Sequence, residues 1–281
     1  MSLIDPETLL VRLGDPDLRI ADVRWWLTEP AKGRRDYDAA HLPGAVFVDL
    51  DTDLAGPPAP VGPGRHPLPD PAGFAARMAE LGFDDDSEIV AYDDAGGTIA
   101  ARLWWMLDDL GHGRVRVLDG GMSAWTAIGG PLTDAAPVRT AGRLRLRDRW
   151  TRTIDRDALA VQLGSVGLID ARAIERYRGD LEPVDAAPGH IPTARSRPTA
   201  GNLRPDGRFL DPEVLRARFA GLAGDVVTYC GSGVNACHNS LAMRVAGLAD
   251  PLLYPGSYSD WVGTGMPIAT GDEPGVMRAG G

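Results

Sequence analysis

The sequence predicts an α/β fold in which a parallel sheet with helices on both faces is built twice. Two observations support this prediction. Short apolar runs alternate with segments of helical length, which is the pattern of strand–helix–strand units. Several short motifs then recur in the same order roughly 140 residues later. The length of 281 residues fits two such domains.

The expected strands are short and apolar throughout, as in strands that are buried on both faces. They cover 89–92 and 115–118 in the first copy, and 226–229 and 252–254 in the second. The expected helices are longer segments with helical periodicity, and they cover 71–81, 99–110, 155–163, 212–223 and 236–248. The alternation predicts strands that are joined by helical crossovers.

The repeated motifs set the domain boundaries. The segment 20–24 resembles 168–172, and Asp93 occupies the place of Cys230. The spacing between matched residues falls by 12 along the chain, so the first copy carries extra residues. We place them in the Pro- and Gly-rich segment 56–64, which predicts a loop. The predicted organisation is a first domain over 1–135, a linker over 136–150 and a second domain over 151–281.

Two smaller features belong to this organisation. The linker contains alternating Arg and Leu over 143–147, which predicts either an edge strand or a segment that runs along the first domain. His41 and His190 stand at matching positions of the repeat, each next to Pro, and we assign both a structural role.

Net charge, apolar runs and cysteine content exclude several classes of protein. A net charge of −10 and a pI near 4.9 argue against a nucleic-acid partner, which needs a basic face. The apolar runs are too short for a membrane span, and the first residues lack a secretory signal. We therefore expect a cytoplasmic protein without a membrane partner. The two cysteines exclude a disulfide framework or a four-cysteine zinc site, and no metal site is predicted.

The segment after the expected strand 226–229 has the composition of a reactive loop. A cysteine at the carboxyl end of a parallel strand lies where ligands bind in open α/β sheets. Glycines permit unusual backbone angles, so the loop amides can converge on one sulfur. The following helix N-terminus adds positive partial charge, and both effects favour the nucleophilic thiolate. The loop reads Cys230-Gly231-Ser232-Gly233-Val234-Asn235-Ala236.

The matching loop of the first copy lacks a thiol. Asp93 places a carboxylate where the second copy would hold an anion. The first domain is therefore predicted to be catalytically silent, and this asymmetry favours a functional Cys230. Cys237, on the expected helix, is more typical of a small core residue.

The loop and the repeat are similar to a known family. The motifs Cys230-Gly231-Ser232-Gly233-Val234, Gly189-His190-Ile191-Pro192 and Pro255-Gly256-Ser257 resemble the tandem-domain rhodanese-type sulfurtransferases over the whole chain. The loop resembles the 3-mercaptopyruvate type. The resemblance implies transfer of a sulfane sulfur from 3-mercaptopyruvate or thiosulfate, through a Cys230 persulfide, to cyanide or a thiol. The resemblance implies no cofactor. It also implies thioredoxin as one of the sulfur acceptors.

The resemblance also implies donor-binding residues. Arg176 matches the family arginine that binds the donor carboxylate or sulfonate, and the Cys230 loop amides from Gly231 to Ala236 would hold the anion. Mercaptopyruvate enzymes usually carry a second arginine a few residues later, and Asp185 stands at that place here. Arg178 and Arg195 are the candidates to replace it.

A proton-shuttle set is implied as well. Ser232 matches the family serine, His66 the histidine and Asp51 the aspartate, with Asp49 and Asp53 as competitors for the last role. His66 precedes the second copy, so this set requires the first copy to reach the loop. Such a set would move a proton during sulfur transfer.

Two other functions are compatible with a cysteine loop between a strand and a helix. A cysteine phosphatase uses a similar loop but needs an arginine six residues after the cysteine, where this chain has Ala236. The alternative that stays open is a non-catalytic sulfur carrier or docking module.

Overall fold

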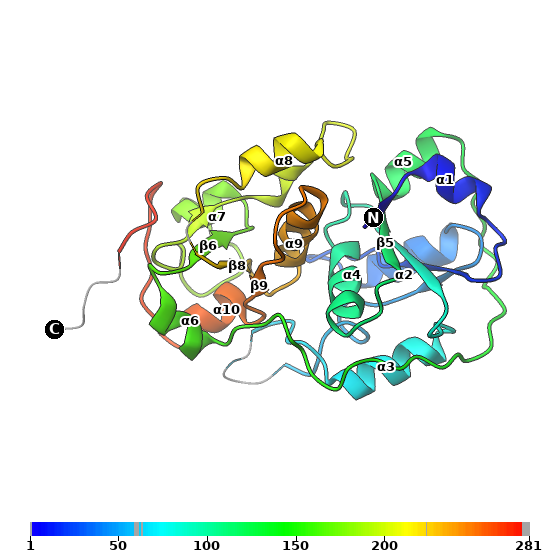
Figure 1. The fold of residues 1–281 in the computed structure, drawn as a ribbon, viewed down its shortest axis with the longest axis horizontal. Helices are drawn as coiled ribbons and strands as arrows, with labels where there is room; N and C mark the ends of the chain where they lie inside the picture. Colours follow the sequence, from blue (N-terminus) through cyan, green and yellow to red (C-terminus); the bar gives the residue numbers. More distant parts are fainter. Residues whose placement is uncertain (1, 59–61, 63, 223, 277–281) are drawn as a thin grey trace. The chain divides into compact units, whose positions relative to one another are not determined.

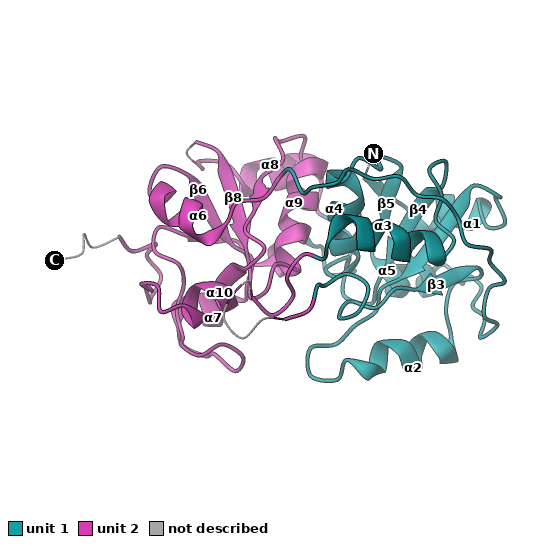
Figure 2. Ribbon diagram, turned by 90° about the horizontal axis from the view of Figure 1, so that it is seen from below, with its two compact units in different colours: residues 1–56, 69–151, 203–209 teal, residues 57–68, 152–202, 210–281 magenta. Residues whose placement is uncertain are grey.

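The computed structural model describes residues 2–58, 62, 64–222 and 224–276. The chain divides into two compact units, shown in different colours in Figure 2. Unit 1 contains Met1–Gly56, Pro69–Thr151 and Leu203–Phe209, and unit 2 contains Pro57–Leu68, Arg152–Asn202 and Leu210–Gly281. Each unit therefore includes one short segment from the other half of the sequence. The predicted boundaries place 57–68 in the first domain and 203–209 in the second. The structure assigns each of these two segments to the other unit.

Unit 1 contains a five-stranded sheet in the order β1-β5-β4-β2-β3, and its paired strands run parallel. Figure 1 colours the chain along the sequence and labels β5 of this sheet. Its elements are β1 (Leu3–Ile4), α1 (Pro6–Val11), β2 (Leu18–Asp22), α2 (Ala31–Ala39), β3 (Ala45–Phe47), α3 (Pro71–Glu80), β4 (Glu88–Tyr92), α4 (Ala100–Asp109), β5 (Val115–Leu118) and α5 (Gly121–Ala127).

Unit 2 contains a four-stranded parallel sheet in the order β7-β6-β8-β9. Its elements are α6 (Arg156–Gln162), β6 (Gly167–Asp170), α7 (Ile174–Arg178), β7 (Arg195–Ser196), the 3₁₀ helix η1 (Thr199–Asn202), α8 (Pro212–Arg218), β8 (Val226–Tyr229), α9 (Asn235–Val245), β9 (Leu252–Leu253) and α10 (Ser257–Gly263).

Three of the helices, α1, α3 and α6, begin at an aspartate that caps the first turn. Asp5 and Asp70 precede Pro at the start of α1 and α3, and each carboxylate accepts from a backbone amide three residues on. This arrangement satisfies an N–H group that the first helical turn leaves unpaired. Apolar side chains of the strands then pack against α1 and α5 in unit 1, and against α6, α7 and α10 in unit 2.

The two units repeat a buried ion pair, at the end of β2 in unit 1 and at the end of β6 in unit 2. Arg24 binds Asp22 at 2.6 Å in unit 1, and Arg172 binds Asp170 at 2.7 Å in unit 2. The two histidines at matching positions of the repeat also make the same contact in each unit. His41 stacks on Tyr37 with 4.0 Å between ring centroids, and His190 stacks on Tyr177 with 3.8 Å. Both histidines are buried, as their structural assignment predicts.

The predicted fold class is confirmed, and the differences are local. The predicted helix 212–223 ends at Arg218, and residue 223 lies outside the described residues, as do 59–61 and 63 of the predicted loop 56–64. The segment 143–147 forms no strand. It runs along unit 1, where Arg145 N donates to Asp85 at 2.6 Å. Within the described ranges, no helix is long and apolar enough to cross a membrane.

Candidate active site

Cys230 lies at the carboxyl end of β8, and α9 begins five residues later. The cysteine is 2% exposed. Gly233 turns the loop with a φ of +80°, a conformation that favours glycine. Its N–H donates to Cys230 Sγ at 3.1 Å. The loop amide and the N-terminus of α9 therefore place positive partial charge at the sulfur.

The start of α10 holds this loop from a second side. Tyr258 N donates to Cys230 O and Ser259 N to Gly231 O, each at 3.0 Å. Cys230 N donates to Ser257 Oγ at 3.1 Å, and that hydroxyl donates to Tyr254 O at 2.9 Å. Ser257 adopts a positive φ of 55° to make these contacts. The motif Pro255-Gly256-Ser257 thus fixes the backbone that carries the cysteine.

The remaining loop residues start the helix. Val234 precedes α9, and Asn235 is its first residue. Ala236 and Cys237 are fully buried, and Cys237 Sγ donates to Gly233 O at 3.3 Å. Cys237 therefore packs in the core beneath the loop.

The corresponding loop of unit 1 is occupied by its own carboxylate. Asp93 Oδ1 accepts from Ala95 N and Gly97 N at 2.9 and 2.8 Å. Its Oδ2 accepts from Ile99 N and Ala100 N at 2.7 and 2.9 Å. Four backbone amides thus converge on one fully buried anionic group, so this loop type binds an anion in this molecule.

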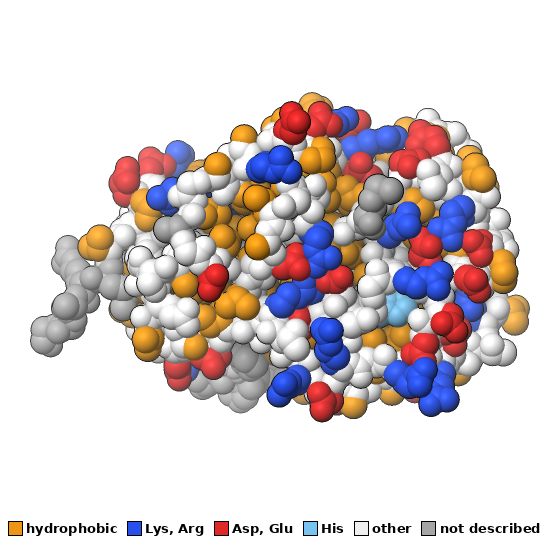
Figure 3. All heavy atoms as spheres, in the orientation of Figure 1, with side chains coloured by type: hydrophobic (Ala, Val, Ile, Leu, Met, Phe, Trp, Pro, Cys, Tyr) orange, Lys and Arg blue, Asp and Glu red, His pale blue; other side chains and the backbone are white. Residues whose placement is uncertain are grey.

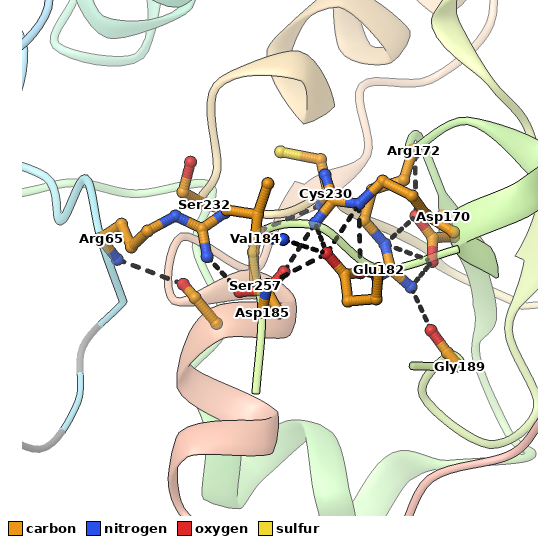
Figure 4. Close-up of polar contacts among 12 residues, drawn as sticks. Arg65, Asp170, Arg172, Glu182, Val184, Asp185, Gly189, Cys230, Ser232 and Ser257 are labelled. Atoms are coloured by element: carbon orange, nitrogen blue, oxygen red, sulfur yellow. Dashed lines mark hydrogen bonds and ion pairs between the residues drawn. The ribbon is translucent and has the colours of Figure 1, made fainter. Parts of the chain in front are cut away.

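Arg176 lies beside the Cys230 loop in a network of charges. Its guanidinium binds Glu182 Oε1 and Asp185 Oδ2, both at 2.8 Å. Burial by itself would raise the pKa of Glu182, but hydrogen bonds from Arg176 and from the Asp185 amide hold that pKa below its ordinary value. Arg172 reaches Glu182 at 3.3 Å (Figure 4). Arg176 is thus held by two carboxylates.

A second arginine, Arg65, reaches the same network. Its Nη1 pairs with Asp185 Oδ1, and its backbone N donates to Ser259 Oγ at 3.1 Å. Figure 4 shows Arg65 and Arg172 on opposite sides of Asp185 and Glu182. Arg65 is not among the site residues predicted from the sequence. The available signal was its position directly before His66.

The predicted shuttle residues are distributed over both units. His66 belongs to the segment of unit 2 that comes from the first half of the chain, and its Nδ1 lies 2.7 Å from Ser232 Oγ. Both side chains are buried. Asp51 belongs to unit 1, where its carboxylate accepts from Trp25 Nε1 at 2.9 Å.

The two alternative arginines have other partners. Arg178 pairs with Asp272, and Arg195 donates to Gly221 O at 3.3 Å.

On the face of the molecule that Figure 3 shows, basic and acidic side chains are interspersed, without a large patch of one sign.

The fold and this loop define a class of protein, in which a cysteine follows a parallel strand and its sulfur accepts from a loop amide. The sequence matches the rhodanese-like domain over residues 5–128 and 155–264. The chain belongs to the rhodanese-like family.

Individual relatives cover nearly the whole chain. A "Probable 3-mercaptopyruvate sulfurtransferase" of Pseudomonas aeruginosa is 44% identical over 279 residues, covering 96% of this chain and 98% of that protein. The thiosulfate sulfurtransferase of Bos taurus is 33% identical over 259 residues, covering 88% and 85%. The structure of the 3-mercaptopyruvate sulfurtransferase from Leishmania major matches with a TM-score of 0.83 at 31% identity, covering 94% of this chain and 75% of that one. The predicted enzyme class, a sulfurtransferase, is confirmed.

Proposed function

We propose that the chain moves a sulfane sulfur from 3-mercaptopyruvate or thiosulfate to cyanide or a thiol through a persulfide on Cys230. The hydrogen bond from Gly233 N to Cys230 Sγ carries this proposal. It places a backbone donor on the sulfur just before α9, where the loop amide and the helix N-terminus present positive partial charge to the reacting atom. Small-molecule donors and acceptors are the substrates of this enzyme class.

The chemistry divides into two displacement steps. The Cys230 thiolate attacks the outer sulfur of thiosulfate, the donor's S–S bond breaks, and sulfite leaves with the electron pair. With 3-mercaptopyruvate the C–S bond breaks instead, and the enolate of pyruvate takes up the proton of the donor's thiol. Cyanide then attacks the outer sulfur of the persulfide, forming thiocyanate and restoring the thiolate. Covalent catalysis of this kind predicts ping-pong kinetics.

The unit 1 loop supports the persulfide step. A carboxylate oxygen lies two bonds from Cβ, as the outer sulfur of a cysteine persulfide does. Four amides bind the two oxygens of Asp93 at this distance from the backbone. By analogy, the Cys230 loop holds the terminal sulfur anion of the persulfide with its own amides.

The 3-mercaptopyruvate reaction needs a proton to move from sulfur to carbon, and we assign this transfer to Ser232 and His66. Their 2.7 Å contact is within hydrogen-bond reach. Asp51 stays the proposed third member of this set. Arg176 is the proposed donor-binding residue, because a guanidinium fork suits a carboxylate or sulfonate.

Steady-state sulfur transfer to cyanide, with each donor in turn, tests the function. We expect Cys230→Ser to abolish transfer and to lose the mass increase of one sulfur atom that the donor produces in the unaltered chain. Cys237→Ser is the matched control, since it removes the other thiol. This variant should keep both the sulfur transfer and the mass increase.

Normal turnover by the Cys230→Ser variant would contradict the mechanism. A persulfide that forms on Cys230 but never turns over would favour the carrier or docking module. Thioredoxin is one proposed thiol acceptor. A cytoplasmic location also stays a prediction, in keeping with two free thiols in a reducing compartment.

A further inference from the structure

Two guanidinium groups flank the residue that follows the nucleophile. A Cβ atom built on Gly231 would lie 2.8 Å from Arg65 Nη2 and 3.5 Å from Arg176 Nη1. Gly231 does not have a positive φ. The atoms nearest to such a Cβ are thus the ends of the two arginine side chains, which lie against the loop backbone at Gly231. The predicted reason for glycine, an unusual backbone angle, applies to Gly233 and not to Gly231.

Asp185 holds both arginines at once. Its Oδ1 pairs with Arg65 and its Oδ2 with Arg176, and its side chain is 2% exposed. Its own N–H donates to Glu182 Oε1 at 3.0 Å, which fixes the turn that carries it. A carboxylate that is buried between two guanidinium groups sets the position of both.

Arg65 retains capacity for a ligand. Its side chain is 30% exposed, so solutes can reach it. A guanidinium has five N–H donors, and Asp185 engages Nη1. Its Nε is buried without a hydrogen-bond partner among the residues that the structure describes. A buried donor without a partner is unfavourable, so Nε adds no hydrogen bond that holds the Arg65 side chain in place.

We propose that Arg65 is the second donor-binding cation of this enzyme and that Asp185 is its positioning residue. This proposal rests on the proposed function. Arg65 and Arg176 together would bind a donor with two or more oxygens on its acid group, a carboxylate or a sulfonate, next to Cys230. The second positive charge thus comes from a residue 120 positions before Asp185. Asp185 itself stands where the resemblance implied a second arginine.

The test separates loading of the sulfur from its discharge. Persulfide formation from thiosulfate and from 3-mercaptopyruvate is followed by rapid mixing, and the loaded enzyme is then discharged with cyanide. For Arg65→Ala we expect kcat/KM for loading to fall about 10- to 100-fold, mainly through KM, as for loss of a charge-assisted hydrogen bond. The discharge rate should stay within about twofold.

Two further variants make the result specific. Arg65→Lys keeps the charge and the pairing with Asp185, so it should recover part of the loss. Arg178→Ala removes a nearby arginine that pairs with Asp272, and loading should be unchanged. Unfolding temperatures show whether each variant is folded.

The outcomes are distinguishable. Unchanged loading by Arg65→Ala, or equal losses in loading and discharge, would overturn the role of Arg65 while leaving the proposed function intact. Failure of the unaltered enzyme to load from either donor would overturn the proposed function itself.

Discussion

Glu182 is the carboxylate that binds two of the arginines near Cys230. Its side chain is 2% exposed, and it binds both Arg172 and Arg176. It also accepts from the amides of Val184 and Asp185. A buried carboxylate with this many donors stabilises the fold only while it is ionised.

We therefore expect Glu182→Gln to lower the free energy of unfolding at pH 7 by about 2 kcal/mol, because buried guanidinium groups lose their counter-charge. The folded-state pKa of Glu182 lies below its ordinary value of 4.5. Its contribution is thus complete above pH 4.5 and disappears as the pH falls through the folded-state pKa.

Urea unfolding of the unaltered protein and of Glu182→Gln between pH 7 and pH 3 measures the difference in their free energies of unfolding. This difference should shrink as the pH falls. Glu175→Gln, an exposed change on α7, is the control. A difference that grows on acidification would contradict the assignment.

At the scale of the element, the loop that joins strand to helix is stabilised differently in the two units. In unit 1 the Asp93 carboxylate satisfies four amides. In unit 2 the start of α10 holds the loop carbonyls, and the loop amide of Gly233 donates to the sulfur. The amides of the first loop are thus satisfied by a side chain of the chain itself, whereas the second loop has Cys230 at the position of that carboxylate.

Asp93→Ala should accordingly destabilise the protein by about 3 kcal/mol, because buried amides lose their acceptor. Sulfur transfer per folded molecule should be unchanged. Asp94→Ala removes the neighbouring, exposed carboxylate and should change stability by less than about 0.5 kcal/mol. Chemical denaturation and cyanide assays on the same samples provide both readouts, and loss of activity in folded Asp93→Ala would refute a silent first loop.

The strands β4, β5, β8 and β9, the helices α3, α4, α6, α8 and α9, and the Cys230 loop were predicted from sequence because their signals are local. Apolar runs, segments of helical periodicity and glycines each act within a few residues. The role of Arg65 could not be predicted in this way, because its contact with Asp185 spans 120 residues and depends on tertiary structure. The same holds for His66, whose segment joins unit 2 although it belongs to the first copy by sequence.

At the scale of the whole molecule, the two units do not coincide with the two sequence repeats. Unit 2 takes residues 57–68 from the first half, and unit 1 takes 203–209 from the second. In unit 1, Phe209 N donates to Asp119 Oδ1 at 2.8 Å. The chain therefore enters each unit more than once.

A fragment of residues 152–281 lacks Arg65 and His66 although it contains Cys230. We expect it to load sulfur at least about 10-fold more slowly than the full chain, even if circular dichroism shows that it folds. The full-length double variant Arg65→Ala/His66→Ala is the control, and it should show a loss of similar size. Loading by the fragment at the rate of the full chain would show that the segment 57–68 contributes nothing to the chemistry.

The carboxylate of Asp93 also fixes the stoichiometry of the enzyme. A loop whose amides are permanently engaged by its own side chain has no place for a sulfur atom. Two duplicated loops thus provide one carrier position, so on the proposed function each chain carries a single sulfur per catalytic cycle. Delivery of two sulfur atoms to one acceptor then requires two successive encounters, or two chains.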